Sequence, residues 1–280
     1  MLKKSLDYLI TVVDFSQEKI FSLVKKTNIK GHVLVGNQKS KAYSEMHFDI
    51  GDAKVDVYNL DSKGVSLNRN FLLIKSQADY VTFLDDDIFF SQNYLESIKV
   101  ELDKEWPNNY SIRFNVSSLN NSRRIKQINK SKNVSLFDLR QYGVWGVLFN
   151  RKYLINNNLF FREYIGPGTS INHGEDYIFL SDYFKSGGKI WQSREAIMHA
   201  EQQDSTWQGK NRDIKKELFA HGHNYRLLYK KRASIYLLIH MLKHIRYYKN
   251  KEYSFFKTYK LGLEGIRFRK DIEKGLRKYE

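Results

Sequence analysis

The feature that decides the fold is the stretch Tyr80-Val-Thr-Phe-Leu-Asp85-Asp86-Asp87-Ile-Phe-Phe90, in which three carboxylates separate two apolar runs. The first run is short and apolar, so it predicts a buried strand over residues 80–84 that ends at the acids. Asp85 and Asp87 point to the same side of an extended segment. Two such oxygen donors suit Mg²⁺ or Mn²⁺, which also take water and substrate phosphates as ligands. The triplet alone leaves open a solvated turn in which one Asp caps the next helix.

Outward from this stretch, the pattern alternates between strands and helices. The expected strands cover 8–13, 32–35, 55–58 and 111–116, and the expected helices cover 16–26, 65–76 and 92–102. Such alternation is typical of an α/β fold with a mostly parallel sheet and helices on both faces. Ligands of these sheets bind beyond the carboxyl ends of the strands, so we expect Asp14, Asn37 and Asp85–Asp87 at the binding edge.

A second acidic pair follows a glycine-rich stretch in Ile165-Gly-Pro-Gly-Thr-Ser-Ile-Asn-His-Gly-Glu175-Asp176-Tyr-Ile-Phe-Leu180. Acids that open an apolar helix are common, because carboxylates favour the positive end of the helix dipole. The functional interpretation is a carboxylate presented as a general base. His199 follows an expected strand at 196–198 and is either a metal or phosphate ligand or a structural histidine.

Composition excludes several classes of protein. The chain has no Cys, so it is neither a disulfide-rich scaffold nor the holder of a Cys-ligated metal site. Its 18 Phe, 19 Tyr and 4 Trp supply enough apolar surface to exclude intrinsic disorder. In 280 residues, 47 Lys and Arg stand against 31 Asp and Glu, a net charge of +16. That excess suggests nucleic acid, an anionic membrane or phosphorylated small molecules as partners.

The excess charge predicts two domains, because it lies almost entirely near the C-terminus. From Lys210 to Glu280, 20 basic residues stand against 7 acidic ones, so this segment carries +13 of the +16. We therefore expect a nearly neutral globular domain over 1–205 and a basic helical extension over 206–280. The extension contains an apolar stripe at helical spacing, formed by Ile235, Leu238, Ile239, Leu242 and Ile245.

Two roles for the basic extension remain open. It can attach peripherally to an anionic membrane, or it can pack its apolar stripe on the first domain. No apolar stretch approaches the roughly 18–20 residues that span a bilayer. The apolar part of the N-terminus is too short for a signal peptide and is bracketed by Asp7 and Asp14. We therefore expect a cytoplasmic protein, peripheral on the inner face of the plasma membrane if the extension binds lipid.

Three elements together resemble family 2 glycosyltransferases with the GT-A fold. They are Gly64-Val-Ser-Leu-Asn-Arg69-Asn70, the strand that ends in Asp85-Asp86-Asp87, and Gly174-Glu175-Asp176. The resemblance covers roughly residues 5–205 and implies a Rossmann-like sheet. It places the nucleotide-sugar half at about 1–100 and the acceptor half at about 101–205. Members of this kind typically assemble bacterial capsular or surface polysaccharides from nucleotide sugars, and most invert the anomeric centre.

The resemblance also implies roles for the acids. Asp176 resembles the catalytic base, with Glu175 as the neighbouring alternative. Asp87 matches the ligand of a Mn²⁺ or Mg²⁺ ion that bridges the diphosphate. Asp85 matches the acid that contacts the ribose or, indirectly, the metal, and Asp86 can assist. The fold family thus implies a metal-dependent enzyme.

The remaining roles concern the nucleotide. Arg69 resembles the family arginine near the phosphates, where a guanidinium donates in a fork. His199 lies where some members place a last metal or diphosphate contact. Thr11 and Asp14 end the first strand, where the family holds the nucleobase. Asn37 can read a base edge, but it lacks the carboxylate that members often have after their second strand. UDP is the default nucleotide through family frequency alone.

The sequence thus predicts an inverting glycosyltransferase that moves a sugar, most simply from a UDP-sugar, to a glycan or lipid-linked saccharide. Trp145, Trp191 and Trp207 are either stacking platforms for the acceptor sugar or ordinary packing residues. A basic nucleic-acid-binding protein is an alternative, but we recognise no nucleic-acid-binding module and expect no nucleic acid partner. A metal-dependent phosphodiester hydrolase that uses the same acids is the other alternative.

Overall fold

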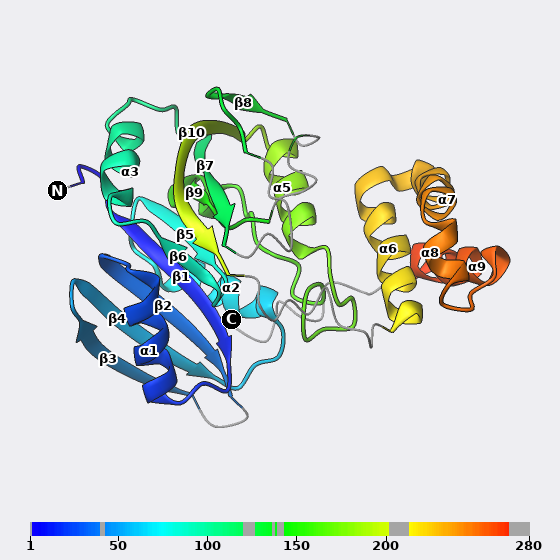
Figure 1. The fold of residues 1–280 in the computed structure, drawn as a ribbon, viewed down its shortest axis with the longest axis horizontal. Helices are drawn as coiled ribbons and strands as arrows, with labels where there is room; N and C mark the ends of the chain where they lie inside the picture. Colours follow the sequence, from blue (N-terminus) through cyan, green and yellow to red (C-terminus); the bar gives the residue numbers. More distant parts are fainter. Residues whose placement is uncertain are drawn as a thin grey trace. The chain divides into compact units, whose positions relative to one another are not determined.

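The computed structural model describes residues 2–39, 43–119, 127–135, 138, 143–201 and 213–268 (Figure 1). The chain divides into two compact units. The first comprises residues 1–169 and 175–209, and the second comprises 170–174 and 210–280. The predicted boundary between residues 205 and 206 lies outside the described residues.

The first unit is an α/β fold with a mostly parallel central sheet, as predicted. Within the described residues ten strands form one sheet in the order β3-β4-β2-β1-β5-β9-β7-β10-β6, and β8 pairs with β10. The strands are β1 (Leu6–Val13), β2 (Gly31–Gln38), β3 (Ser44–Ile50), β4 (Ala53–Leu60), β5 (Tyr80–Leu84), β6 (Ile88–Phe90), β7 (Tyr110–Ser118), β8 (Lys132–Val134), β9 (Val147–Asn150) and β10 (Lys189–Ala200). The helices are α1 (Gln17–Thr27), α2 (Val65–Lys75), α3 (Tyr94–Leu102), α4 (Arg151–Asn156) and α5 (Glu175–Lys185).

Every strand and helix predicted for this unit is present, with ends shifted by a few residues. Ser16 caps α1 as its position suggests, because its hydroxyl accepts the N–H of Lys19 at 3.3 Å. The sequence pattern missed β3, β6, β8, β9 and α4. Three of the missed strands have only three or four residues, too few for a period to show, and β3 is a largely solvated edge strand.

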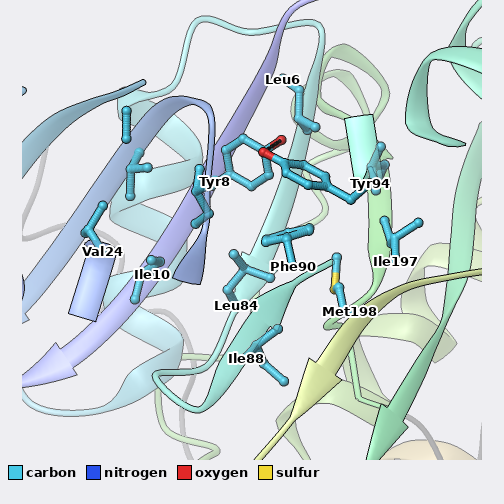
Figure 2. Close-up of a cluster of buried hydrophobic side chains, with 14 of the residues drawn as sticks. Leu6, Tyr8, Ile10, Val24, Leu84, Ile88, Phe90, Tyr94, Ile197 and Met198 are labelled. Carbon is cyan, nitrogen blue, oxygen red and sulfur yellow. Dashed lines mark hydrogen bonds between the residues drawn. The ribbon is translucent and has the colours of Figure 1, made fainter. Parts of the chain in front are cut away.

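Helices cover both faces of the sheet. Alternate strand residues point to opposite sides, so each face presents apolar side chains that pack against helices. Tyr8 and Ile10 of β1 join a core with α1 and α3, whereas Leu9 joins a core with α2 and α5. In the first core, Figure 2 shows Tyr8, Phe90 and Tyr94 meeting between β1, β6 and α3. Tyr8 donates to the Tyr94 hydroxyl at 3.2 Å, and the Phe90 and Tyr94 rings lie 4.4 Å apart. This packing fixes β6, and with it the acids directly before β6.

A histidine bound by two carboxylates joins the amino-terminal parts of β1, β2 and β4. His32 Nδ1 lies 3.0 Å from Asp7 Oδ1, and His32 Nε2 lies 2.9 Å from Asp56 Oδ2. The hydrogen bond to Asp7 outweighs partial burial and, with Asp56, raises the pKa of His32 to about 9. A protonated His32 therefore bridges three strands near neutral pH.

This bridge predicts a loss of stability at alkaline pH. The folded-state pKa of His32 is above the unfolded value of about 6.5, so its contribution is complete below pH 6.5 and disappears as pH rises through about 9. Because the side chain is 38% exposed, we expect solvent screening to limit it to about 1 kcal/mol. Urea unfolding should show His32→Gln less stable than wild type at pH 6, with the difference nearly gone at pH 10. An equal difference at both pH values would contradict a charged His32.

The second unit is helical. It comprises α6 (Ile214–Tyr229), a short 3-10 turn (Lys230–Arg232), α7 (Ala233–Lys243), α8 (Ile245–Lys249) and α9 (Phe255–Arg267). Helices α6 and α9 cross in close backbone contact, where only glycine fits. A Cβ added to Gly222 would lie 1.9 Å from the Gly262 carbonyl oxygen, and one added to Gly265 would lie 2.0 Å from that of Phe219. No helix in the described part of the chain is long and apolar enough to cross a membrane.

Candidate active site

Helix α2 carries the Gly-x-Ser-x-x-Arg-Asn element, and its polar residues are buried. The Ser66 hydroxyl donates to the Ile165 carbonyl at 2.5 Å. The Asn70 side chain donates to the Phe161 carbonyl and accepts the Phe161 N–H, both at 2.8 Å. Polar side chains at buried helix positions are costly unless they are hydrogen-bonded. Here they fasten the loop of residues 161–165 to α2 and leave Arg69 between them.

Arg69 joins three carboxylates from two distant parts of the sequence. Its Nη1 donates to Asp176 Oδ1 at 2.6 Å, its Nη2 donates to Asp85 Oδ1 at 2.9 Å, and Glu175 Oε1 lies 3.9 Å from Nη1. The side chain is 3% exposed, and its guanidinium lies 5.2 Å from the centre of the Phe161 ring. Burial alone lowers the pKa of Arg69, but the fields of Asp176, Asp85 and Glu175 outweigh burial and raise it. Arg69 is therefore a permanent positive charge.

Glu175 and Asp176 open α5 but have different surroundings. Asp176 keeps 21% of its side chain exposed, and its Oδ2 accepts the N–H of Val144 at 3.3 Å. Glu175 is 10% exposed, and its Oε2 is buried with no hydrogen-bond partner among the described residues. Burial raises the pKa of both acids; the nearby Asp176 raises that of Glu175 further, and Arg69 opposes both shifts. Asp176 is thus the more exposed of the two acids that open α5.

Trp145 lies next to Asp176. A Cβ added to Gly143 would be 2.4 Å from Trp145 Nε1 and 2.6 Å from Asp176 Oδ2, so the indole and the carboxylate flank one glycine. Trp191 instead packs on Trp106, with ring centroids 5.4 Å apart. Trp207 lies outside the described residues. Of the tryptophans that the sequence singles out, the structure places Trp145 beside the acids.

The antiparallel pairing of β6 with β10 brings Asp87 and His199 to one face. His199 pairs with Phe89, and the N–H of Glu201 donates to the Asp87 carbonyl at 3.0 Å. Side chains alternate along strands, so Asp87, Phe89, His199 and Glu201 share a face. The opposite face is formed by the buried residues Ile88, Phe90, Met198 and Ala200.

The donor set on this face suits an ion that a substrate helps to bind. The described residues hold no group of three His, Asp or Glu side chains arranged to bind a metal by themselves. His199 Nδ1, however, is buried without a hydrogen-bond partner among those residues. One carboxylate and one imidazole fit an ion such as Mn²⁺ or Mg²⁺ whose remaining ligands are water and phosphate oxygens.

The carboxyl edge of the sheet gathers the residues expected near the nucleotide. Ile10 pairs with Leu84 in parallel, so Thr11 and Asp85 are the next residues on adjacent strands. Asp14 is exposed just beyond β1, with φ at +52°, and its N–H donates to the Gln38 carbonyl at 2.9 Å. Asp85 is 42% exposed and Asp86 is exposed, so acids border this edge.

The side chain of Asn37 differs from the expectation, because it is not available to a nucleobase. Its side chain is fully buried, accepts the N–H of Phe15 at 3.0 Å, and donates to the Phe15 carbonyl and to Asn59 Oδ1 at 2.9 Å each. These bonds use nearly all the capacity of the amide. Asn37 therefore fastens the loop after β1 and presents no free amide to a base.

Comparison with known proteins now identifies the family. The model of glycosyl transferase family 2 matches residues 20–167, which include Arg69 and the acidic triplet. The chain belongs to glycosyltransferase family 2. No curated protein sequence shows a significant match.

Solved structures of S. aureus TarS share this fold at low sequence identity. TarS 1–349 has a TM-score of 0.58 and 13% identity, covering 95% of this chain and 93% of that chain. Its complex with UDP-GlcNAc gives 0.60 and 12%, covering 92% and 90%. Its complex with UDP gives 0.57 and 13%, covering 95% and 93%. These similarities show that the glycosyltransferase has a GT-A-like fold.

Sequence patterns missed one contact within the second unit of this glycosyltransferase. Residues Ser170–Gly174, directly before Glu175, belong to the second unit. Asn224 of α6 donates to the His173 carbonyl at 2.9 Å. Gly174 has φ at +99°, and a Cβ there would lie 2.1 Å from Asn224 Nδ2. Within the second unit, α6 therefore holds residues 170–174, and only glycine fits at the last of these positions.

Sequence patterns also missed Phe161, the aromatic ring beside Arg69. It stacks on Phe179 of α5, with centroids 4.1 Å apart and an interplanar angle of 7°. No local pattern marks Phe161, which is one of two consecutive phenylalanines in a loop. Asn70, which binds the Phe161 carbonyl, belongs to the Gly-x-Ser-x-x-Arg-Asn element, but that element does not indicate which residue it binds.

Proposed function

We propose that the protein is an inverting glycosyltransferase that moves a sugar from a UDP-sugar to a glycan or a lipid-linked saccharide. One observation carries the proposal: buried Arg69 binds both Asp85, at the carboxyl edge of the sheet, and Asp176, at the start of α5. The donor edge and the candidate base therefore belong to one ion-paired cluster. The presence of UDP and UDP-GlcNAc in the TarS complexes supports UDP as the nucleotide.

Asp176 serves as the general base. Its carboxylate accepts the proton of the acceptor hydroxyl while that oxygen forms a bond to the anomeric carbon of the donor. The bond from this carbon to the nucleotide's phosphate oxygen breaks on the opposite face, and the electron pair leaves with the diphosphate. The configuration inverts in a single displacement. Arg69 orients the Asp176 carboxylate and stabilises its negative charge. The exposed part of Asp176 is available to the acceptor.

Asp87 and His199, with Asp85 nearby, are the residues that would hold Mn²⁺ or Mg²⁺. An ion held by these residues would supply positive charge to the departing diphosphate. Asp86 remains an auxiliary acid at the same turn. Thr11 in β1 and the exposed Asp14 just after it would lie beside the nucleoside. Asn37 holds the loop after β1 in place.

Trp145, which packs partly buried against the core and whose indole nitrogen lies beside Gly143 near the base, would contact the acceptor sugar. We place the reaction in capsular or surface polysaccharide synthesis, on the cytoplasmic side of the plasma membrane. Membrane-anchored acceptors would be within reach there if the second unit binds the bilayer peripherally. The basic charge of that unit supports such attachment.

A thermal-shift screen tests donor and metal together. We expect UDP-GlcNAc or another UDP-sugar, at a hundredfold excess over Kd, to stabilise the protein by about 2.7 kcal/mol in the presence of Mn²⁺. GDP-mannose and dTDP-glucose should give smaller shifts. Asp87→Asn should lose the Mn²⁺-dependent part, whereas Asp103→Asn, the same change at the end of α3, should keep it.

Each outcome of the screen is decisive. No stabilisation by any nucleotide sugar, with or without metal, would refute the proposed donor class. Equal stabilisation with Mn²⁺ and with EDTA would refute the metal. A shift confined to GDP-mannose would replace UDP with GDP.

A further inference from the structure

Helix α7 in the second unit has two apolar sides, and the described part of the chain packs against only one of them. Its inward side, formed by Ala233, Leu237 and Met241, is at most 1% exposed. The predicted apolar stripe lies on the opposite side: Ile235, Leu238, Ile239 and Leu242 are 58%, 38%, 54% and 55% exposed. Residues four apart share one side of a helix, so the two sets are separated by about half a turn.

The exposed stripe continues beyond α7. Ile245, the first residue of α8, is 44% exposed. It also lines a cavity of about 260 Å³ between α7, α8 and the start of α9, together with Met241, Tyr248 and Phe255. Phe256, next to Phe255, is 83% exposed. Figure 1 shows α7 leading through α8 into α9. We call the five residues Ile235, Leu238, Ile239, Leu242 and Ile245 the α7 face.

Basic residues surround the α7 face. Between residues 230 and 267 there are ten Lys and Arg but only two acids, Glu252 and Glu264. The basic residues nearest to the face along the chain are all exposed: Lys230, Lys231, Arg232, Lys243, Arg246 and Lys249. A partner of this surface therefore needs negative charge beside an apolar interior.

We propose that the α7 face inserts into an anionic lipid surface, with its apolar side chains at the acyl boundary and its basic side chains among the headgroups. A second copy of the chain fits poorly, because it would bring two segments of +13 together. An anionic polymer matches the charge but gives no apolar partner for five exposed aliphatic side chains. The inference rests on the proposed membrane association and names the surface responsible for it.

Vesicle flotation of the full chain tests this surface. We expect the protein to float with vesicles of phosphatidylglycerol and phosphatidylcholine, and at least tenfold less with pure phosphatidylcholine. Ile239→Asn/Leu242→Asn should reduce flotation with anionic vesicles at least tenfold. Ile74→Asn/Val100→Asn is the matched control, because these residues of α2 and α3 are equally exposed, at 57% and 63%, and should leave flotation unchanged.

Two further measurements test whether the α7 face is covered by something other than lipid. If Ile239→Asn/Leu242→Asn lowers Tm as a core change would, the face is covered by the chain's own catalytic unit and the proposal is wrong. If the variant changes the oligomeric state by light scattering, the face is a self-association surface and the proposal is wrong. Wild-type protein that ignores anionic vesicles, or a variant that floats like wild type, also overturns it. Donor-induced thermal shifts, measured without vesicles, show separately whether the proposed catalytic function holds.

Discussion

Asp176→Asn should lower the rate of sugar transfer by about 10²–10⁴-fold while donor binding stays within about twofold. An amide keeps the shape of the side chain, and its one oxygen can still accept the 2.6 Å bond from Arg69, although the 3.3 Å bond from Val144 to the other oxygen is lost. It cannot accept a proton from the acceptor hydroxyl. The measurement is UDP release from the stabilising UDP-sugar in the presence of a saccharide acceptor panel, with donor binding followed by thermal shift.

Asp182→Asn is the matched control for this prediction. It makes the same change nearly two turns further along α5, where the carboxylate forms a partly exposed pair with Arg162 at 2.9 Å. We expect unchanged transfer in this control. Asp176→Asn with transfer within tenfold of wild type would remove Asp176 from the role of base. If Glu175→Gln alone abolished transfer, the base would be Glu175, the alternative that the motif leaves open.

Arg69→Met should lower the free energy of unfolding by about 3–5 kcal/mol and abolish transfer. The guanidinium is 3% exposed and is the shared cation of Asp85, Asp176 and Glu175. Its removal leaves acids at the start of α5 without a counter-charge, and Glu175 among them is buried. Urea unfolding at pH 7 measures the loss, and Arg69→Lys should recover part of it, because an ammonium keeps the charge but not the fork.

Arg162→Met makes the same change at a partly exposed pair. Both partners there are about 30% exposed, so the expected loss is at most about 1 kcal/mol. In a double-mutant cycle, Arg69→Met and Asp176→Asn should cost less together than the sum of the two, because the second change removes a carboxylate that the first left unpaired. Additive losses, or a loss at Arg69 no larger than at Arg162, would show that the cluster does not depend on the arginine.

Local pattern predicted much of the fold because neighbouring residues suffice to specify it. The apolar run 80–84 before the acids, the cap at Ser16 and the helical spacing in 65–76 all depend on residues a few positions apart. Those elements are β5, α1 and α2 in the structure. Strands of three or four residues, such as β6 and β9, escaped prediction, because a two-residue period cannot be recognised over so short a run.

The candidate site was predictable as a set of residues but not as an arrangement. The motif that contains Arg69 and the two acidic elements are legible in the sequence, since each is a local cluster of unusual residue types. That Arg69 binds Asp85 and Asp176, 16 and 107 residues away, follows only from the packing of α2 against the sheet and α5. The burial of Asn37 likewise depends on the course of the loop after β1.

The sequence by itself determined the α/β order of elements, the family and the basic character of the C-terminal segment, because composition, period and motif are properties of contiguous residues. Only the tertiary structure decided that Asp176 is more exposed than its neighbour Glu175, and that the aliphatic stripe of α7 faces outward while Ala233, Leu237 and Met241 face inward. Both are matters of burial. Burial is set by what the rest of the chain places against a side chain, and a helical period shows that an apolar side exists without showing what covers it.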